Sequence, residues 1–125
     1  METCWILDDQ YGEKIYKEIR YFFPDWDYPV KKNIINPLEF IDKIQNWAII
    51  LLDNYFPWKW WEEALGDIFL KELMQKKKKV RIVCISDYGE KLLEMYDNWE
   101  TAYKHWYIIG FVKSKDWFEI GELFL

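Results

Sequence analysis

The chain has 125 residues, the length of one ordinary domain, and we expect residues 1–125 to form a single domain. Its net charge of −5 argues against a nucleic-acid-binding surface, because such surfaces concentrate Lys and Arg to neutralise phosphates. The absence of an apolar run of about 18 residues and of a signal-peptide pattern argues against a membrane protein and predicts a cytoplasmic one. Cys4 and Cys84 lie within apolar runs, which favours free thiols in a reducing compartment.

Apolar runs and turn residues predict five short strands that alternate with five helices. The expected strands cover residues 3–7, 28–31, 48–52, 80–86 and 106–112. The expected helices cover residues 11–23, 36–44, 67–75, 89–103 and 116–124, and an aromatic connection spans residues 54–65. Pro29 limits residues 28–31 to an edge strand, because proline cannot donate to a strand ladder. By contrast, the aliphatic and small residues before Asp53 fit a central strand that is buried on both faces.

This alternation predicts an α/β fold, a parallel sheet with helices on both faces joined by right-handed crossovers. In such a sheet with strand order 2-1-3-4-5, ligands bind at the carboxyl ends of the strands, where the order reverses between the first and third strands. Polar residues end four of the strands. They are Asp8 and Asp9 after the first strand, Asp53 after the third, Ser86 after the fourth and Lys113 after the fifth.

Three carboxylates in one crevice repel one another and favour a bound cation. Mg²⁺ is the natural candidate, because it is a hard ion that prefers oxygen ligands and keeps several waters. With the Ser86 hydroxyl and the Lys113 ammonium beside it, the crevice could also hold the oxygens of a phosphoryl group. A carboxylate nucleophile in that position can accept phosphate and form an acyl phosphate.

At these residues the chain resembles the receiver domain of two-component response regulators. The matching segments are Leu7-Asp8-Asp9 after the first strand, Leu52–Pro57 after the third, Ile85-Ser86 at the fourth and Gly110–Lys113 at the fifth. The likeness extends over nearly the whole chain, and its strength lies in the order of the four motifs at successive strand ends. It implies a flavodoxin-like (βα)5 fold with a five-stranded parallel sheet of order 2-1-3-4-5.

The resemblance also implies a role for each site residue. Asp53 would accept the phosphoryl group, and Ser86 and Lys113 would sense it. Mg²⁺ would be held by Asp8, Asp9, Asp53 and the backbone carbonyl of Tyr55. The last two helices would then form the output face.

The chain departs from the family pattern at three places near the expected site. An insertion rich in tryptophan, from Trp58 to Trp61, precedes Gly66 and lies beside the pocket, where it could cover the pocket or dock a partner. Asp87 follows Ser86, where the family usually has a small residue, so a like charge faces the phosphoryl site. The spacing of the last strand's aromatic residue, Phe111, leaves open whether the strand is irregular or whether Lys115 replaces Lys113 as the sensing lysine.

The sequence therefore predicts a single-domain response regulator that is phosphorylated on Asp53 by a histidine kinase or phosphotransfer protein. It would signal through altered contacts with a downstream protein, and the many aromatic residues leave a homodimer possible. One alternative is an atypical receiver that works as a protein interaction module without phosphorylation. A second, ranked lower because Tyr55 stands where a general acid is needed, is a Mg²⁺-dependent phosphohydrolase.

Overall fold

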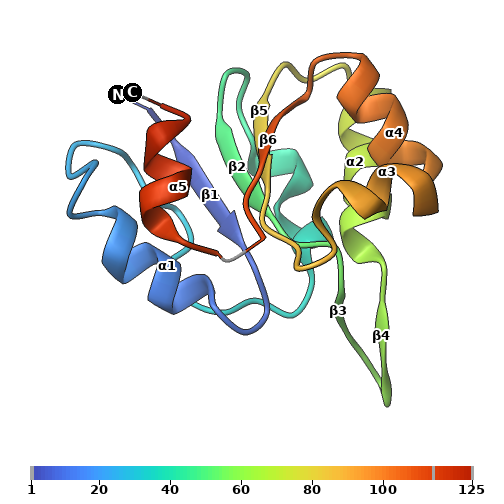
Figure 1. The fold of residues 1–125 in the computed structure, drawn as a ribbon, viewed down its shortest axis with the longest axis horizontal. Helices are drawn as coiled ribbons and strands as arrows, with labels where there is room; N and C mark the ends of the chain where they lie inside the picture. The colour runs from blue at the N-terminus through green and yellow to red at the C-terminus, as the bar shows by residue number, and fades with distance from the viewer. Residues whose placement is uncertain (1, 114, 125) are drawn as a thin grey trace.

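The computed structural model describes residues 2–113 and 115–124. Within these residues, a parallel sheet has the strand order β1-β2-β5-β6, and an antiparallel hairpin, β3-β4, forms a second small sheet (Figure 1). The strands are β1 (Cys4–Leu7), β2 (Ile49–Leu52), β3 (Phe56–Trp58), β4 (Trp61–Glu63), β5 (Arg81–Cys84) and β6 (Ile108–Phe111). The helices are α1 (Gly12–Ile19), η1 (Pro37–Lys43), α2 (Leu65–Gln75), η2 (Gly89–Lys91), α3 (Leu92–Met95), α4 (Asp97–Lys104) and α5 (Trp117–Glu122).

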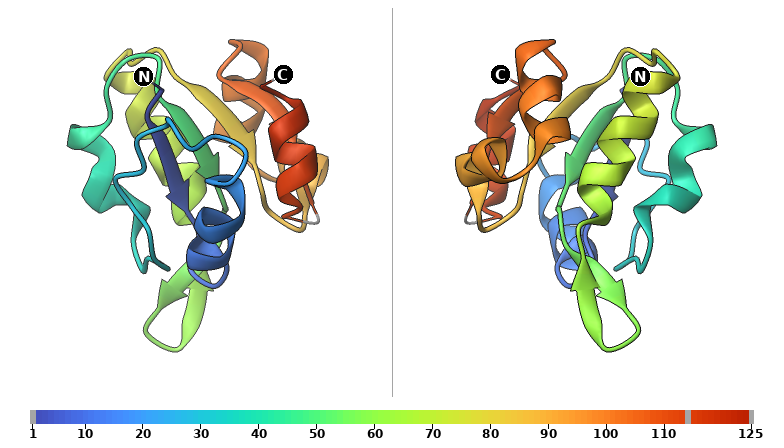
Figure 2. Two further views of the ribbon diagram at one scale, coloured as in Figure 1. Left: turned by 90° about the vertical axis from the view of Figure 1, so that its left-hand side faces the viewer. Right: turned by 90° about the vertical axis from the view of Figure 1, so that its right-hand side faces the viewer.

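The sheet is the middle layer of three. Helices α1 and α5 cover one face, whereas α2, α4 and η1 cover the other (Figures 1 and 2). Side chains alternate along β2, so Ile49 and Leu51 pack with α1 and α5 while Ile50 and Leu52 pack with α2 and α4. All four are fully buried, and each contributes roughly 1.5–3 kcal/mol of hydrophobic stabilisation. The apolar run therefore forms the centre of the molecule, and the chain must turn polar where β2 leaves it.

The predicted α/β class with a parallel sheet is confirmed, but the expected edge strand at residues 28–31 does not form. In its place the chain runs beside β1 and makes one isolated bridge, between Thr3 and Asp27. Two backbone hydrogen bonds hold it there, from the Cys4 amide to the Asp27 carbonyl and from the Asp27 amide to the Glu2 carbonyl, each 2.8 Å long. Pro29, two residues after Asp27, has no amide hydrogen to extend the ladder. The observed strands keep the order expected for strands 1, 3, 4 and 5.

Three further segments differ from the prediction. The segment 36–44 contains a 3₁₀ helix, η1, which Asn36 caps by accepting a hydrogen bond from the Leu38 amide at 2.9 Å. The helix expected over residues 89–103 is divided into η2, α3 and α4, and α3 is separated from α4 because Tyr96 adopts an extended conformation with φ −136° and ψ 123°. The aromatic connection contains the hairpin β3-β4, which extends beyond the body of the molecule at the end toward which β1 points (Figures 1 and 2).

None of the helices formed by the described residues is long and apolar enough to cross a lipid bilayer. Both cysteines are free and buried.

Candidate functional site

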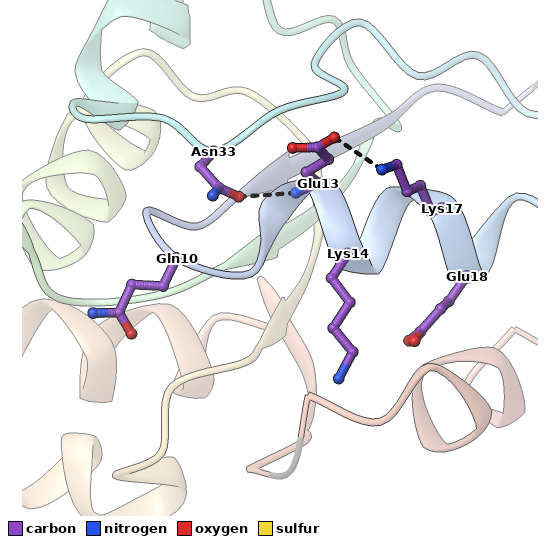
Figure 3. Close-up of a pocket in the computed structure, with 6 residues that line it drawn as sticks. All are labelled: Gln10, Glu13, Lys14, Lys17, Glu18 and Asn33. Atoms are coloured by element: carbon purple, nitrogen blue, oxygen red, sulfur yellow. Dashed lines mark hydrogen bonds and ion pairs between the residues drawn. The ribbon is translucent and has the colours of Figure 1, made fainter.

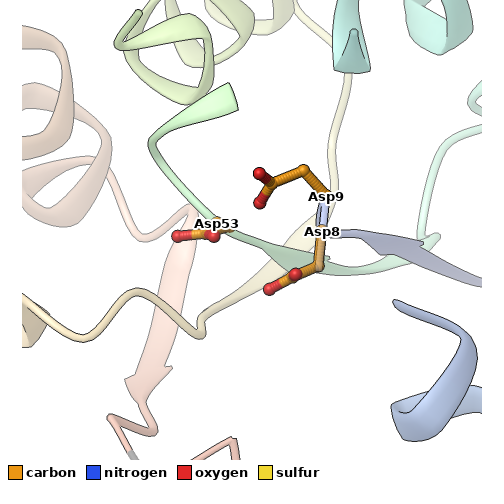
Figure 4. Close-up of side chains that lie close together, drawn as sticks. All are labelled: Asp8, Asp9 and Asp53. Carbon is orange, nitrogen blue, oxygen red and sulfur yellow. The ribbon is translucent and has the colours of Figure 1, made fainter. Parts of the chain in front are cut away.

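Three carboxylates meet at the carboxyl ends of β1 and β2. Asp8 and Asp9 directly follow β1 and Asp53 directly follows β2, and the two strands are paired in register, Leu7 beside Leu52 (Figure 4). Each of these three acids has a carboxylate oxygen within 4.8 Å of one from each of the others. Asp8 is fully buried and Asp53 is 8% exposed. The parallel pairing thus brings together the acids that the sequence predicted to converge.

Lys115 supplies a counter-charge to two of these acids. Its Nζ donates to Asp8 Oδ2 and to Asp53 Oδ2, the latter at 3.2 Å, and its side chain is only 10% exposed. The other oxygen of each acid accepts hydrogen bonds from the backbone. Asp8 Oδ1 accepts from the amides of Gln10 at 2.8 Å and Tyr11 at 2.7 Å, and Asp53 Oδ1 accepts from the Asn54 amide at 2.8 Å.

The pKa values of these groups shift because the site is buried and densely charged. Burial raises the pKa of Asp53 to about 7, Asp8 adds to the rise, and the Lys115 ammonium opposes it. Burial and the neighbouring Asp8 also raise the pKa of Asp9. Burial alone would lower the pKa of Lys115, but attraction to Asp53 and Asp8 outweighs it and raises that pKa. One ammonium therefore does not fully compensate the three carboxylates.

A small cavity of about 100 Å³ opens beside the acids. Asp9, Asp53, Ser86 and Lys115 all line it. Ser86 follows β5 and is 1% exposed, and its Oγ accepts a hydrogen bond from the Tyr88 amide at 3.3 Å. The structure thus brings the predicted serine into one cavity with the predicted acids and with a lysine.

Tyr55 and Asp87 also line this cavity. The Tyr55 hydroxyl forms a hydrogen bond of 2.7 Å with the Tyr96 hydroxyl, which holds the ring at the wall. The Tyr55 backbone carbonyl as a metal ligand stays a prediction. Asp87 places a further carboxylate beside Ser86, as the sequence indicated.

The structure does not bring Lys113 to the acids. Lys113 is exposed, and its aliphatic carbons lie so close to Gly89 that a Cβ on that glycine would be 2.3 Å from Lys113 Cε. The spacing of Phe111 left open an irregular strand or a change of lysine; the strand is irregular, and Lys115 rather than Lys113 contacts the acids, while a sensing role stays a prediction. The ladder between β5 and β6 shifts register after the pair Ile82–Ile108, and Lys115 reaches the carboxylates from a left-handed backbone conformation with φ 54°.

The donor set of this site fits a divalent metal ion. The three acids offer hard oxygen ligands within reach of one shared ion, and burial raises the pKa of Asp53 and Asp9 while no other cation lies beside them than Lys115 among the described residues of the cavity. Two of the acids already bind a cation, because the Lys115 ammonium forms ion pairs with both Asp8 and Asp53.

Two residues at the site were not identified from the sequence. Glu62, from β4 of the hairpin, lines the cavity, and the Tyr11 ring lies 5.1 Å from Lys115 Nζ. The register of the hairpin pairs Pro57 with Glu62. A hairpin signal could have located Glu62, but the tight turn at Lys59, with φ 55°, lacks the glycine or asparagine that usually marks such turns. Nothing in the sequence pattern marks Tyr11.

A larger hollow of about 430 Å³ lies along α1 (Figure 3). Its charged side chains are of both signs, and Glu13 and Lys17 pair with each other at 3.0 Å. The Glu13 amide donates to Asn33 Oδ1 at 2.9 Å, which joins the helix to the loop beside it. With its charges balanced and its groups exposed, this hollow lacks the unmet charge that marks the acidic cavity.

Comparison with known proteins agrees with this geometry. No family model and no curated protein matches the sequence. A response regulator from Colwellia psychrerythraea is similar in structure, with a TM-score of 0.70 and 17% identity over 98% of this chain and 94% of that one. The receiver domain of Francisella response regulator 1452 has a TM-score of 0.56 and 19% identity, over 98% and 92% of the two chains. The Mn²⁺-bound form of response regulator Rcp1 has a TM-score of 0.56 and 16% identity, over 98% and 88%. The chain has the fold of response regulator receiver domains.

Proposed function

We propose that residues 1–125 form one receiver-like domain that accepts a phosphoryl group on Asp53 in a Mg²⁺-dependent reaction. The observation that supports it is the shared cavity at the strand ends, where Asp53 lies among two further acids, a buried serine and a lysine. A phosphohistidine of a histidine kinase or phosphotransfer protein would be the donor. The two buried free cysteines agree with a cytoplasmic location.

The chemistry assigned to the side chains follows from their charges. An oxygen of the Asp53 carboxylate attacks phosphorus, the bond from phosphorus to the donor nitrogen breaks, and that nitrogen leaves with the electron pair and takes up a proton. The Lys115 ammonium and the Ser86 hydroxyl, which line the same cavity as Asp53, would donate hydrogen bonds to the phosphoryl oxygens. Asp8, Asp9 and Asp53 would hold Mg²⁺, which supplies charge neutralisation for the phosphoryl group when bound.

A hydrogen-bond network offers a route from Asp53 to α4. Asn54, next in sequence, accepts a buried hydrogen bond from Trp99 Nε1 of α4 at 2.8 Å. The Tyr55–Tyr96 bond of 2.7 Å ends at the residue before α4. A change in the position of Asp53 on phosphorylation would therefore bias α4, and a downstream protein, or a second copy of the chain, would respond to that face.

The decisive experiment is phosphorylation by a small donor. The protein is incubated with Mg²⁺ and an acyl phosphate such as acetyl phosphate, and its intact mass is measured. We expect a gain of about 80 Da, one phosphoryl group, in the wild type. The gain should be absent in Asp53→Asn and without Mg²⁺. The matched control is Asp25→Asn, an exposed acid after α1, which should be modified like the wild type.

Modification that persists in Asp53→Asn would contradict the proposal. A protein that gains no mass with any donor would favour a second candidate, an interaction module that works without phosphorylation. The observation in favour of that candidate is the extra negative charge at the cavity, where Glu62 and Asp87 both line the wall that a phosphoryl dianion would face.

A further inference from the structure

The hairpin β3-β4 adds a carboxylate to the cavity at the strand ends. Side chains of β4 alternate between its two faces, and Trp61 and Glu63 share one face, since Trp61 Nε1 donates to Glu63 Oε1 at 2.5 Å. Opposite Glu63, Phe56 of β3 is fully buried in the core. Glu62 therefore points to the other face of the hairpin, and on that face it lines the cavity with Asp9 and Asp53.

The charges on the cavity wall leave Glu62 without a cationic partner there. Of the described residues that line the cavity, Lys115 is the only cation, and it is already bonded to Asp8 and Asp53. Glu62 is therefore a further like charge on the cavity wall that Asp9 and Asp53 line. Phe56 is buried and anchors the base of the hairpin, so Glu62 stays near the aspartates. The repulsion between Glu62 and these acids therefore persists until a further cation binds.

We propose that Glu62 is a fourth acidic residue of the divalent cation site and that ion binding draws the hairpin β3-β4 toward Asp9. This inference rests on the proposed function only in its use of the same cation site. A cation at the three aspartates converts the repulsion on Glu62 into attraction, either by direct coordination or through a metal-bound water. The position of the inserted hairpin would therefore depend on whether a cation occupies the site.

The first test measures cation affinity with and without Glu62. Mn²⁺ is titrated into the protein at low ionic strength, and the free ion is followed by electron paramagnetic resonance. We expect Glu62→Gln to weaken binding roughly three- to tenfold, because a negative charge is lost from the wall of the same cavity. The matched control is Glu63→Gln, which removes the same charge from the next residue on the opposite face and should change the affinity less than about twofold.

The outcomes separate this inference from the proposed function. Wild-type protein that binds no Mn²⁺ would overturn both. Binding that is lost in Asp9→Asn but unchanged in Glu62→Gln would overturn the role of Glu62 alone. Equal weakening by Glu62→Gln and Glu63→Gln would show a general charge effect and would also overturn it.

The second test follows the hairpin itself through trypsin cleavage after Lys59, in its turn. Cleavage after the exposed Lys32 serves as the internal reference. We expect Mn²⁺ to slow cleavage at Lys59 at least threefold relative to the reference in the wild type, and not in Glu62→Gln. A ratio that Mn²⁺ leaves unchanged in the wild type would overturn the movement of the hairpin.

Discussion

Lys115 forms ion pairs with two buried carboxylates, whereas Lys113 forms none among the described residues. The Lys115 ammonium bonds to Asp8 and Asp53 from a nearly buried position, and its left-handed backbone conformation costs a lysine roughly 1 kcal/mol or more. That cost is offset by the ion pairs at the strand ends. Lys113 is exposed and packs its aliphatic carbons against Gly89. The two lysines therefore form a natural pair for comparison.

We predict that Lys115→Met lowers the free energy of unfolding by about 2–4 kcal/mol at pH 8, since it leaves two carboxylates without their cation. Lys113→Met should change it by less than about 0.5 kcal/mol. Urea unfolding in the presence of a chelator measures both variants. Addition of Mg²⁺ should restore much of the loss in Lys115→Met, because a dication replaces the missing charge. Equal losses in the two variants would contradict the assignment of Lys115.

The same residues show how far the site could be predicted from the sequence. Asp8 and Asp53 directly follow an apolar strand and Ser86 lies two residues beyond one, so the end of the strand fixes the place of each side chain. The lysine could not be fixed in this way. The register of the ladder shifts within β6, and the left-handed residue Lys115 lies between β6 and α5; the local sequence pattern indicates neither.

At the scale of elements, α2 packs directly against the end of β2 through Gly66. The Gly66 amide donates to the Asn54 carbonyl at 2.9 Å, and a Cβ on Gly66 would lie 2.3 Å from the Asp53 carbonyl oxygen and 2.7 Å from Asn54 Cα. Both obstacles are backbone atoms, which cannot rotate away as a flexible side chain could. The start of α2 is thus held against the strand that carries Asp53.

We predict that Gly66→Ala destabilises the protein by about 2 kcal/mol, because the overlap outweighs the small gain in helix propensity. Gly121 of α5 is the matched control. There a Cβ would meet Phe23 Cε2 at 3.6 Å, an ordinary contact, so Gly121→Ala should be neutral or stabilise by up to about 1 kcal/mol. Thermal unfolding of both variants decides the matter, and a neutral Gly66→Ala would show that α2 is free to move away from β2.

The helices and strands differ in how well the sequence predicts them. Strands β1, β2, β5 and β6 were predicted because each lies in an apolar run that two layers of helices cover. The hairpin β3-β4 was missed because its stability depends on pairing across a turn, Trp58 beside Trp61, without a typical turn residue. The segment 28–31 does not form a strand for a different reason, since the bridge to the start of the chain stops at Asp27 and Pro29 has no amide hydrogen to extend it.

The molecule has a group of negative charges at the carboxyl ends of its parallel strands. The net charge is −5, and the cavity at the strand ends is lined by Asp9, Asp53, Glu62 and Asp87 with a single lysine. The parallel order of the sheet makes this arrangement, because every strand presents its carboxyl end to the same rim. Folding of the metal-free chain therefore works against its own electrostatics, and the stability of the molecule should depend on pH in a defined direction.

Asp53 determines that direction. Its pKa rises from an ordinary value near 4 in the unfolded chain to about 7 in the folded protein, so the folded state binds more protons between these two pH values. Stability from this group is complete below pH 4 and is lost as the pH rises through 7. Asp53→Asn stays neutral, so we predict that it is more stable than the wild type at pH 8, by about 2–4 kcal/mol, and nearly equal at pH 4.5.

Urea unfolding of both proteins between pH 4.5 and 8, in a chelator, measures this difference. Contributions from groups far from Asp53 are the same in both proteins and cancel when the two free energies of unfolding are subtracted. Mg²⁺ should stabilise the wild type more than Asp53→Asn at pH 8 and so reduce the gap, because the ion binds the folded carboxylate form. If Asp53→Asn were instead the less stable protein at pH 8, the ion pair with Lys115 would outweigh the cost of burying Asp53, and the site would be balanced without a metal.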